Sequence, residues 1–202
     1  MDLYVFGAGQ IAEVVAYYFR ERGGIRHQYF VVDPDFHPGG TVDGRPVLAW
    51  EEAVARADRE VDRWFTAMSS RRRNALRQSK AEEIARAGFH FGSLIHPSAQ
   101  VWRGFHLPPN TIVMENNILQ YKCDLGANSI LWSSNHIGHH TSIGANTFIT
   151  SEVVISGSCR IGDNCFFGVN ATVFDNVTLG DRVIVGAGSV AREDTPDGSV
   201  IV

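Results

Sequence analysis

The sequence predicts a small N-terminal α/β domain of Rossmann-like type over residues 1–92, followed by a parallel β-helix of about six coils over residues 93–202. Two observations carry this prediction. Apolar residues recur at every sixth position through the second half of the chain, and a strand–glycine turn–helix–strand pattern opens the first half. A helix would repeat its apolar residues every three to four positions and a simple strand every two, so a period of six fits neither.

The period of six runs without an insertion from Ile95 to Ala191. Its apolar positions are Ile95, Val101, Leu107, Val113, Leu119, Leu125, Leu131, Ile137, Ile143, Ile149, Ile155, Ile161, Phe167, Val173, Leu179, Val185 and Ala191. The next residue is often glycine, as at Gly126, Gly138, Gly144, Gly162, Gly168, Gly180 and Gly186. Small residues precede the apolar position by two. This is the signature of hexapeptide coils.

Each hexad is expected to form one short strand and one turn, so that three hexads close a triangular coil. Gly126, Gly144, Gly162 and Gly180 would then stack along one corner, where glycine supplies backbone freedom. Asn117 and Asn135 would form an inward asparagine ladder. Phe148, Phe166 and Trp132 are expected on the outer faces, which would favour association into a trimer.

The N-terminal segment reads as half of a nucleotide-binding unit. A strand at 2–6 leads through Gly7-Ala8-Gly9 into a helix at 10–21, and a second strand at 29–32 ends at Asp33-Pro34-Asp35. The glycine turn would bring phosphate to a helix N-terminus, and the acids would read a ribose or base. The candidate substrate-binding residues here are Gly7, Ala8, Gly9, Gln10, Asp33 and Asp35.

The dinucleotide fingerprint is incomplete, because Ala12 stands where it requires glycine. The domain is also short for two mononucleotide halves, which favours one nucleotide over NAD. A merely structural α/β unit remains the alternative.

The rest of this domain is predicted as a strand near 45–47, a helix over 51–59, a strand over 64–67 and a basic helix over 69–86. The basic helix has two interpretations. Its arginines, Arg71, Arg72, Arg73 and Arg77, form a solvated face. Alternatively, one of them lies with Ser69 and Ser70 at the helix N-terminus, near the nucleotide phosphates.

Composition excludes several classes. The net charge of −4 and a pI near 6.0 argue against nucleic acid as a partner. No apolar run has the length of a membrane span, and the N-terminus does not resemble a signal peptide, so a cytoplasmic location is expected. Cys123, Cys159 and Cys165 fall at inward positions, which favours small buried residues over disulfides or a metal cluster.

Histidines concentrate in one segment, Asn135–His140, which holds three of the eight. His136 directly precedes the inward Ile137 and should lie on a flat face. His139 follows Ile137 by two residues and should lie at a corner, where it could face a neighbouring prism. Histidine suits general-base chemistry because its pKa lies near working pH.

The stretch Ser134–Val173, SNHIGHHTSIGANTFITSEVVISGSCRIGDNCFFGVNATV, resembles the left-handed β-helix acyltransferases. More narrowly, the chain from Leu3 to about Val202 resembles the sugar acyltransferases with an N-terminal nucleotide-binding domain. That group includes the N-acetyltransferase of bacillosamine synthesis and the so-called sialic acid O-acetyltransferases. The resemblance implies left-handed coils, a homotrimer, and an acyl-CoA groove between two prisms.

The resemblance also implies roles for residues. The proposed general base of the group matches His139, with His140 beside it as the second catalytic candidate. The acyl-CoA contacts match Gly157, Val169, Gly186 and Ala187, and Phe148 is added as a candidate. The nucleotide contacts match the Gly7–Gly9 turn and Asp33 or Asp35. One departure is His140 itself, where the bacillosamine enzyme has an acid, so Glu115 or no acid would orient His139. The other is Ile11, where that enzyme has a histidine in its glycine turn.

The leading hypothesis is an acetyl-CoA-dependent N-acetyltransferase acting on a nucleotide-linked amino sugar, in bacterial surface polysaccharide or lipopolysaccharide biosynthesis. Transfer would be direct, because all three cysteines read as inward, and no metal is expected. The alternatives are a sugar O-acetyltransferase, a zinc-dependent hydro-lyase using His136 with His139 or His140, and a non-catalytic nucleotide-sugar binder.

Overall fold

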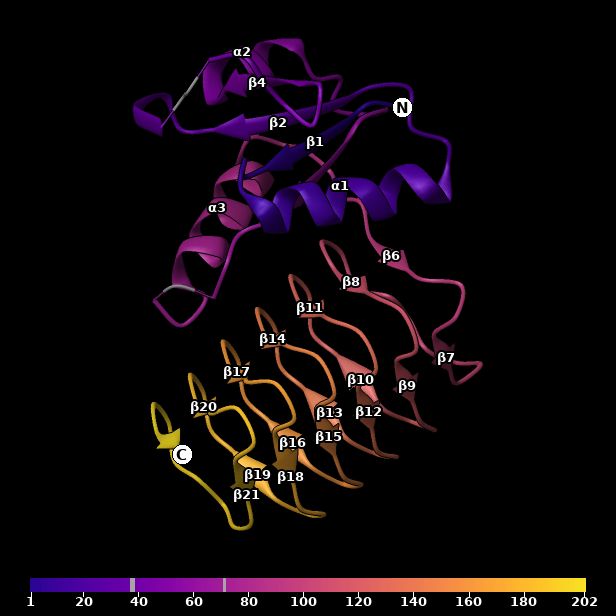
Figure 1. The fold of residues 1–202 in the computed structure, drawn as a ribbon, viewed down its shortest axis with the longest axis vertical. Helices are drawn as coiled ribbons and strands as arrows, with labels where there is room; N and C mark the ends of the chain where they lie inside the picture. The colour runs from indigo at the N-terminus through magenta and orange to yellow at the C-terminus, as the bar shows by residue number, and fades with distance from the viewer. Residues whose placement is uncertain (37–38, 71) are drawn as a thin grey trace. The chain divides into compact units, whose positions relative to one another are not determined.

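A computed structural model describes residues 1–36, 39–70 and 72–202 (Figure 1). The chain divides into two compact units. The first comprises residues 1–69 and 76–93, and the second comprises residues 70–75 and 94–202. The short segment 70–75 therefore belongs with the C-terminal half, although its neighbours in the chain on both sides belong with the N-terminal half.

The first unit is built on a five-stranded sheet with the order β3-β4-β2-β1-β5. Its strands are β1 (Leu3–Phe6), β2 (Gln28–Val32), β3 (Thr41–Val42), β4 (Arg45–Ala49) and β5 (Arg63–Thr66). All pairings are parallel except that of β3 with β4. Because β2 and β5 flank β1 on opposite sides, the strand order reverses at β1, which is where open α/β sheets bind ligands.

Helices cover both faces of this sheet. They are α1 (Gln10–Arg22), α2 (Trp50–Arg56) and α3 (Ala75–Arg86), and a short 3₁₀ turn, η1, spans Pro34–Phe36. Phe19 of α1 packs on Phe65, with ring centroids 5.4 Å apart. The opposite face holds a buried cluster that includes Tyr4, Trp64 and Ile84 of α3. The predicted Rossmann-like unit is present, because alternate side chains of each strand pack against the helices on opposite faces of the sheet.

The helix predicted over 69–86 begins later than expected. Arg72, Arg73 and Asn74 have φ values of 52°, 52° and 63°, so they lie in the left-handed region and cannot start a right-handed helix. Asn74 is buried, and its side-chain amide donates to the carbonyls of Asn164 and Cys165 at 3.2 and 3.0 Å. Arg77 is also fully buried, which contradicts a solvated face at that position. Arg71 lies outside the described residues.

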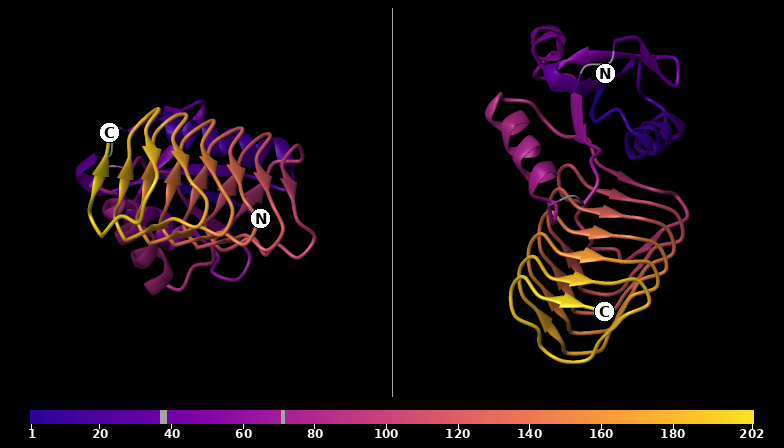
Figure 2. Two further views of the ribbon diagram at one scale, coloured as in Figure 1. Left: turned by 90° about the horizontal axis from the view of Figure 1, so that it is seen from below. Right: turned by 60° about the vertical axis from the view of Figure 1, so that its left-hand side comes forward.

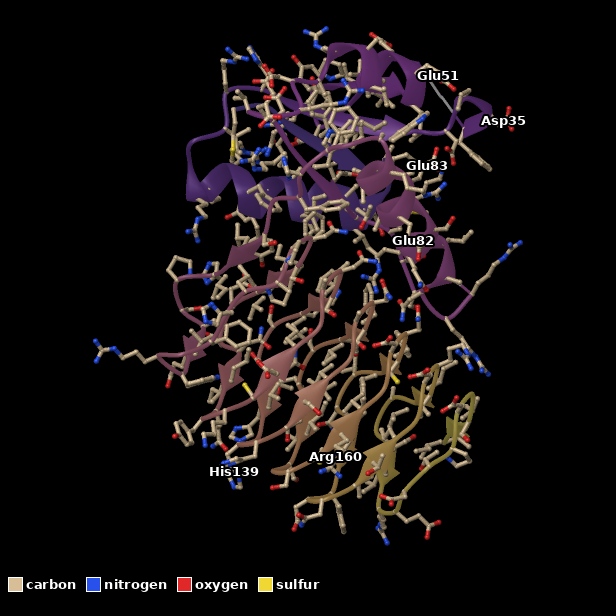
Figure 3. All side chains as sticks on the ribbon, turned by 180° about the vertical axis from the view of Figure 1, so that it is seen from behind. Asp35, Glu51, Glu82, Glu83, His139 and Arg160 are labelled. Carbon is tan, nitrogen blue, oxygen red and sulfur yellow. The ribbon has the colours of Figure 1, made fainter. Side chains whose placement is uncertain are left out.

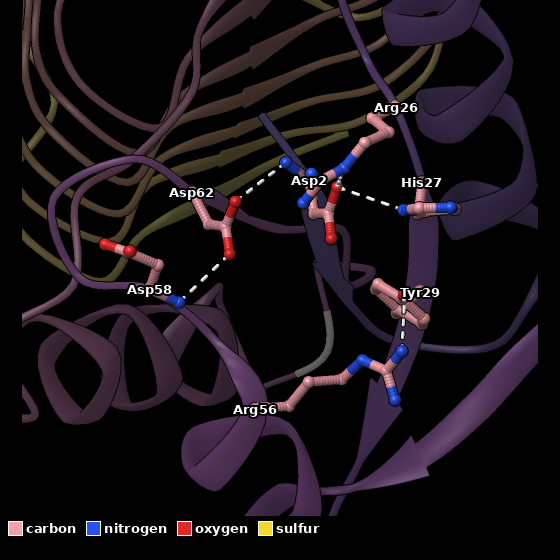
Figure 4. A network of polar contacts seen from close by, with 7 residues as sticks. All are labelled: Asp2, Arg26, His27, Tyr29, Arg56, Asp58 and Asp62. Atoms are coloured by element: carbon pink, nitrogen blue, oxygen red, sulfur yellow. Dashed lines mark hydrogen bonds and ion pairs between the residues drawn. The ribbon is translucent and has the colours of Figure 1, made fainter.

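A polar network closes the amino-terminal edge of the sheet (Figure 4). The backbone N–H of Asp2 donates to Asp62 at 2.8 Å, and Arg26 donates to the Asp2 carboxylate at 2.9 Å. Burial alone would raise the pKa of Asp2, but hydrogen bonds from Arg26 and His27 lower it overall. Arg56 lies over the Tyr29 ring and donates to its hydroxyl.

The second unit is a parallel β-helix whose two-residue strands form three ladders (Figures 1 and 2). The first ladder contains β6 (Leu94–Ile95), β8 (Ile112–Val113), β11 (Ile130–Leu131), β14 (Phe148–Ile149), β17 (Phe166–Phe167), β20 (Ile184–Val185) and β22 (Val200–Ile201). The second contains β7 (Gln100–Val101), β9 (Ile118–Leu119), β12 (His136–Ile137), β15 (Val154–Ile155), β18 (Thr172–Val173) and β21 (Val190–Ala191). The third contains β10 (Asp124–Leu125), β13 (Ser142–Ile143), β16 (Arg160–Ile161) and β19 (Thr178–Leu179). We call the turn that follows each ladder's strands the first, second and third corner, respectively.

The interior of the coils follows the predicted register. The apolar hexad residues from Val113 to Ala191 are buried together, and the three cysteines lie among them. Asn117 and Asn135 are buried as expected, although the link between them runs from the Asn135 backbone N–H to Asn117 Oδ1 at 3.3 Å. A ladder that sequence reasoning missed joins Asn110, Asn128 and Asn146 through their side-chain amides at 2.7 and 2.6 Å.

The corner glycines lie where predicted, but backbone freedom is not the reason that glycine is needed there. In each turn from residue 110 to residue 188, the left-handed residue lies three positions after the inward residue and is most often asparagine, as at Asn128 and Asn146. Gly162 is not in the left-handed region. Instead, a Cβ there would lie 2.6 Å from both the Asp181 nitrogen and the Gly180 carbonyl carbon. These glycines are therefore required by the close approach of the next coil.

The expected exposure of Phe148 is also wrong, since its side chain is 4% exposed. Phe148 points outward from the first ladder, but its neighbours in that ladder are large too. Its ring stacks on Phe166 with centroids 6.0 Å apart, and Ile130 in the preceding coil is fully buried. Within the described residues, no helix is both long and apolar enough to cross a membrane.

Candidate functional site

The second corner presents the histidine cluster. His136 points outward from β12 and is half-buried, whereas His139 and His140 lie on the turn and are exposed. The backbone N–H of His139 donates to Gln120 Oε1 at 3.1 Å. Figure 3 shows the His139 side chain on the outer edge of the coils. The registers predicted for the three histidines thus agree with their observed positions.

Gly157 occupies the position one coil after His139 and leaves space for its ring. A Cβ on Gly157 would lie 2.7 Å from His139 Cε1, 2.9 Å from Nε2 and 3.1 Å from Nδ1. The imidazole therefore lies directly against the glycine backbone. Most other glycines near the corners approach the backbone of the next coil, whereas Gly157 approaches a side chain.

His140 lies beside His139 with its backbone in the left-handed region, at φ 59°. The Nδ1 atoms of the two rings are 3.2 Å apart, which is hydrogen-bond distance. The ring of Tyr121 meets His140 edge-on, with centroids 5.8 Å apart. His140 also borders an open groove of about 500 Å³, whose other lining residues are Trp102, Gly104, His106, Lys122, Asp124, Thr141 and Ser142.

Glu115, considered as an orienting acid, lies at a different corner. It follows β8 of the first ladder, and its carboxylate accepts a hydrogen bond from Ser133 Oγ at 2.7 Å. Within one chain it is therefore separated from His139 by a strand ladder. Sequence reasoning missed Gln120, which accepts from the His139 backbone, and Tyr121, which contacts His140. The 18-residue register points to Tyr121, which occupies the His139 position one coil earlier.

The candidate acyl-CoA residues occupy two corners. Gly157 lies beside His139 at the second corner, whereas Val169 and Ala187 lie one above the other at the first corner, where both are exposed. Gly186 directly precedes Ala187. Phe148 lies on the first ladder, and its burial leaves little ring surface for a ligand. Within one chain, Gly157 and Val169 therefore lie at different vertices of the coils.

The glycine turn of the first unit carries the chain from the end of β1 into α1. Gly7 ends β1 with φ 123°, and a Cβ there would lie 2.6 Å from the Ala67 carbonyl oxygen beyond β5. Ala8 is half-buried, and Gly9 and Gln10 are exposed. Gly9 caps α1, and a Cβ placed on it would meet no atom within 4 Å. The turn thus leaves the N-terminus of α1 open at the carboxyl edge of the sheet.

Asp33 and Asp35 lie on either side of Pro34, after β2. Asp33 is half-buried, and Lys80 of α3 donates to its carboxylate while also donating to Glu83 at 2.8 Å. Asp35 is exposed on η1, and Ser69 is half-buried in the loop after β5. Ser69 precedes the left-handed turn and is not at the first turn of α3, so the predicted helix N-terminus at Ser69 is wrong.

The cysteines lie inside the coils, as predicted. Burial raises the pKa of Cys123 to about 12 and that of Cys165 to about 11, and it raises the pKa of Cys159 as well. Over residues 1–36, 39–70 and 72–202, no three His, Cys, Asp or Glu side chains are grouped closely enough to hold a metal ion. One chain therefore offers neither an accessible thiol nucleophile nor a zinc ligand set in its described part.

Comparisons with known proteins agree with this architecture. A family model described as the hexapeptide repeat of succinyl-transferase matches residues 159–190. No curated protein matches the chain in sequence. Among solved structures, the acetyltransferase domain of PglB from Neisseria gonorrhoeae FA1090 is 28% identical, with a TM-score of 0.89, over 98% of this chain and 95% of that one.

A second solved structure is a histidine-to-asparagine variant of perosamine N-acetyltransferase from Caulobacter crescentus, in complex with CoA and GDP-perosamine. It is 27% identical, with a TM-score of 0.89, over 99% of this chain and 92% of that one. WeeI from Acinetobacter baumannii, at 17% identity and a TM-score of 0.82, shares the fold. The repeat match and the whole-length likenesses to the PglB domain and the perosamine enzyme show that this chain is similar to the hexapeptide-repeat acyltransferases, with a left-handed β-helix after a Rossmann-like N-terminal domain.

Proposed function

We propose that this protein is an acetyl-CoA-dependent N-acetyltransferase whose acceptor is a nucleotide-linked amino sugar, and that His139 is its general base. The observation that carries the proposal is the exposed His139 ring, held against Gly157 at a corner of the coils. Two acetyltransferase structures of similar sequence, one of them a perosamine N-acetyltransferase bound to CoA and GDP-perosamine, support the choice of reaction and substrate class.

The acceptor is proposed to bind through the first unit. The open N-terminus of α1, formed by Gly7, Ala8, Gly9 and Gln10, suits the phosphates of a nucleotide, because backbone N–H groups and the helix dipole both attract anions. Asp33 and Asp35 would read the ribose or base, and Ser69 is a further candidate contact. Lys80 holds one oxygen of Asp33, so the other oxygen is the one offered to a hydroxyl or N–H group.

Acetyl-CoA is proposed to bind between two prisms of a homotrimer. Gly157 would come from the second corner of one chain, and Val169, Gly186 and Ala187 from the first corner of the next. The exposed Val169 and Ala187 offer an apolar edge suited to the pantetheine arm. An assembly of this kind makes each active site depend on two chains, and it would act in polysaccharide biosynthesis in the cytoplasm.

The chemistry assigned to His139 is proton transfer. As the acceptor nitrogen bonds to the thioester carbonyl carbon, Nε2 of His139 takes a proton from that nitrogen. When the C–S bond breaks, the same imidazole returns the proton to the thiolate sulfur, so the enzyme ends unchanged. Holding both substrates in one groove supplies the entropic part of the rate enhancement.

A thiol-release assay tests this function. The purified protein is incubated with acetyl-CoA and a panel of UDP- and GDP-linked amino sugars, alongside matched sugars that carry a hydroxyl in place of the amine. We expect free CoA to appear with at least one amino sugar and the product to be an amide by NMR. Release with the hydroxyl series alone would assign O-acetylation, and nucleotide-sugar binding without any release would assign a binding protein.

A further inference from the structure

His139, the proposed base, has a neighbour that determines which of its ring nitrogens is basic. This inference rests on the proposed function. We propose that His140 is a positioning residue for His139. Its Nδ1 atom accepts the Nδ1–H of His139, which leaves Nε2 of His139 as the basic nitrogen. The 3.2 Å separation of the two Nδ1 atoms is the observation behind the proposal.

The direction of this hydrogen bond decides whether His139 can act. Two neutral imidazoles that face each other through Nδ1 share one proton, so one ring donates and the other accepts. If His140 donates, the proton of His139 lies on Nε2 and that nitrogen is no longer a base. If His139 donates, Nε2 carries a lone pair. The reaction selects the second arrangement, because His139 becomes an imidazolium during transfer and must then donate at Nδ1.

The surroundings keep the two rings in this relation. Gln120 accepts from the His139 backbone, and the His139 ring lies against Gly157, where a Cβ would come within 3.1 Å of three ring atoms. The His139 and His140 rings meet at 82° with centroids 5.4 Å apart, and the Tyr121 and His140 rings meet at 85° with centroids 5.8 Å apart. The pair is therefore braced by residues of three successive coils.

Because His140 must be neutral to accept the hydrogen bond, the activity depends on the protonation of both imidazoles, that of His139 and that of His140. A proton on either imidazole before substrate binds would disable the pair, since His140 could then no longer accept or His139 could no longer act as a base. The charged and titratable groups around the pair are Lys122, Asp124 and His106 in the groove beside His140, and Asp175 two coils beyond His139 on the same corner. The acidic limb of the pH–rate profile should therefore steepen toward a two-proton dependence.

Substitutions at position 140 separate a hydrogen-bond role from a packing role. His140→Asn keeps an acceptor oxygen but removes one titrating group. We expect kcat within about tenfold of the parent, measured with the same sugar substrate. The acidic limb of the pH–rate profile should then depend on one proton fewer. His140→Ala removes the acceptor, and we expect kcat to fall at least ~10-fold with little change in KM for acetyl-CoA. Glu152→Ala, at another left-handed turn residue with φ 62°, controls for the stability cost of alanine in this conformation.

A second readout does not depend on turnover. Long-range ¹H–¹⁵N NMR of the histidine rings in the unliganded protein should show His139 mainly as the Nδ1–H tautomer in the parent and in His140→Asn. His140→Ala should shift it toward Nε2–H. The proposal is overturned if His140→Ala keeps the parent tautomer and pH profile, or if His140→Asn loses as much activity as His140→Ala. A protein that shows the expected tautomers but releases no CoA would instead refute the proposed function.

Discussion

The third and second corners of the β-helix share one backbone path but carry different side chains. At the third corner, glycine recurs at 126, 144, 162 and 180, and aspartates of successive coils accept backbone hydrogen bonds, as Asp181 does from Asp163 N–H at 2.8 Å. At the second corner, the column that contains His139 changes chemistry in every coil, from Tyr121 through Gly157 to Asp175. A repeated corner serves coil stacking, whereas an irregular corner is free to carry a site. This contrast can be tested by changing matched positions.

The largest expected effect is at His139. His139→Ala should lower kcat by roughly 10²–10⁴-fold, because the substrate nitrogen loses its proton acceptor. The KM for acetyl-CoA should change little. Steady-state kinetics with the acceptor identified above would measure both.

The neighbouring histidines provide the internal comparison for that experiment. His140→Ala should cost less than His139→Ala, and His136→Ala, on the flat second ladder, should cost least. If His136→Ala proved the inactive variant while His139→Ala stayed active, the second corner would not be the catalytic one.

The next effect separates two glycines. Gly162→Val should destabilise the protein by about 1–3 kcal/mol, because the new side chain would meet the backbone of the next coil. Thermal unfolding should show a melting temperature several degrees lower. Gly157→Ala, whose Cβ would meet only the His139 ring among its three nearest contacts, should instead keep the melting temperature and lower kcat.

The reverse outcome would be informative. A Gly157→Ala protein that melts early but turns over normally would mean that this glycine serves coil stacking like those of the third corner. The ring position of His139 would then not depend on it.

A smaller effect is expected from the aspartates. Asp163 Oδ1 accepts from the Ala145 backbone N–H at 2.7 Å, so Asp163→Ala should cost about 1 kcal/mol, whereas Asp163→Asn should be nearly neutral because it keeps the acceptor. Asp175→Ala, at the equivalent position of the second corner, should have less effect on stability. Urea unfolding of the three variants would contradict the comparison if Asp175→Ala were the most destabilised.

The smallest expected signal is the reactivity of the three cysteine thiols inside the coils, in the core that the second and third corners share. Burial raises the pKa of all three cysteine thiols, to about 12 for Cys123 and about 11 for Cys165, so they stay protonated at pH 8. We expect none to react with Ellman's reagent in the native protein and all three to react in denaturant. A thiol that reacts rapidly in the folded protein would reopen a covalent route.

The sequence allowed the coils to be predicted because a period of six constrains every inward side chain. The register of His136, His139 and His140 followed from that period directly. Close contacts between coils were not predictable in the same way. The contact of His139 with Gly157 and the stacking of Phe148 on Phe166 depend on which side chains occupy adjacent coils. The different corners of Glu115 and His139, in contrast, follow from the period itself. The delayed start of α3 was missed because nothing in the residues 72–74 themselves demands a left-handed turn.

The segment 70–75 has a consequence for how this protein can be divided. The chain passes from the α/β unit to the coils, back again and then to the coils once more, so the two units are not consecutive modules joined by one linker. A fragment that begins near residue 93 would lack Asn74, the donor that satisfies the carbonyls of Asn164 and Cys165. Exchange of N-terminal domains between relatives, as a route to new acceptor specificity, would therefore have to carry the recipient's own residues 70–75 along with its coils.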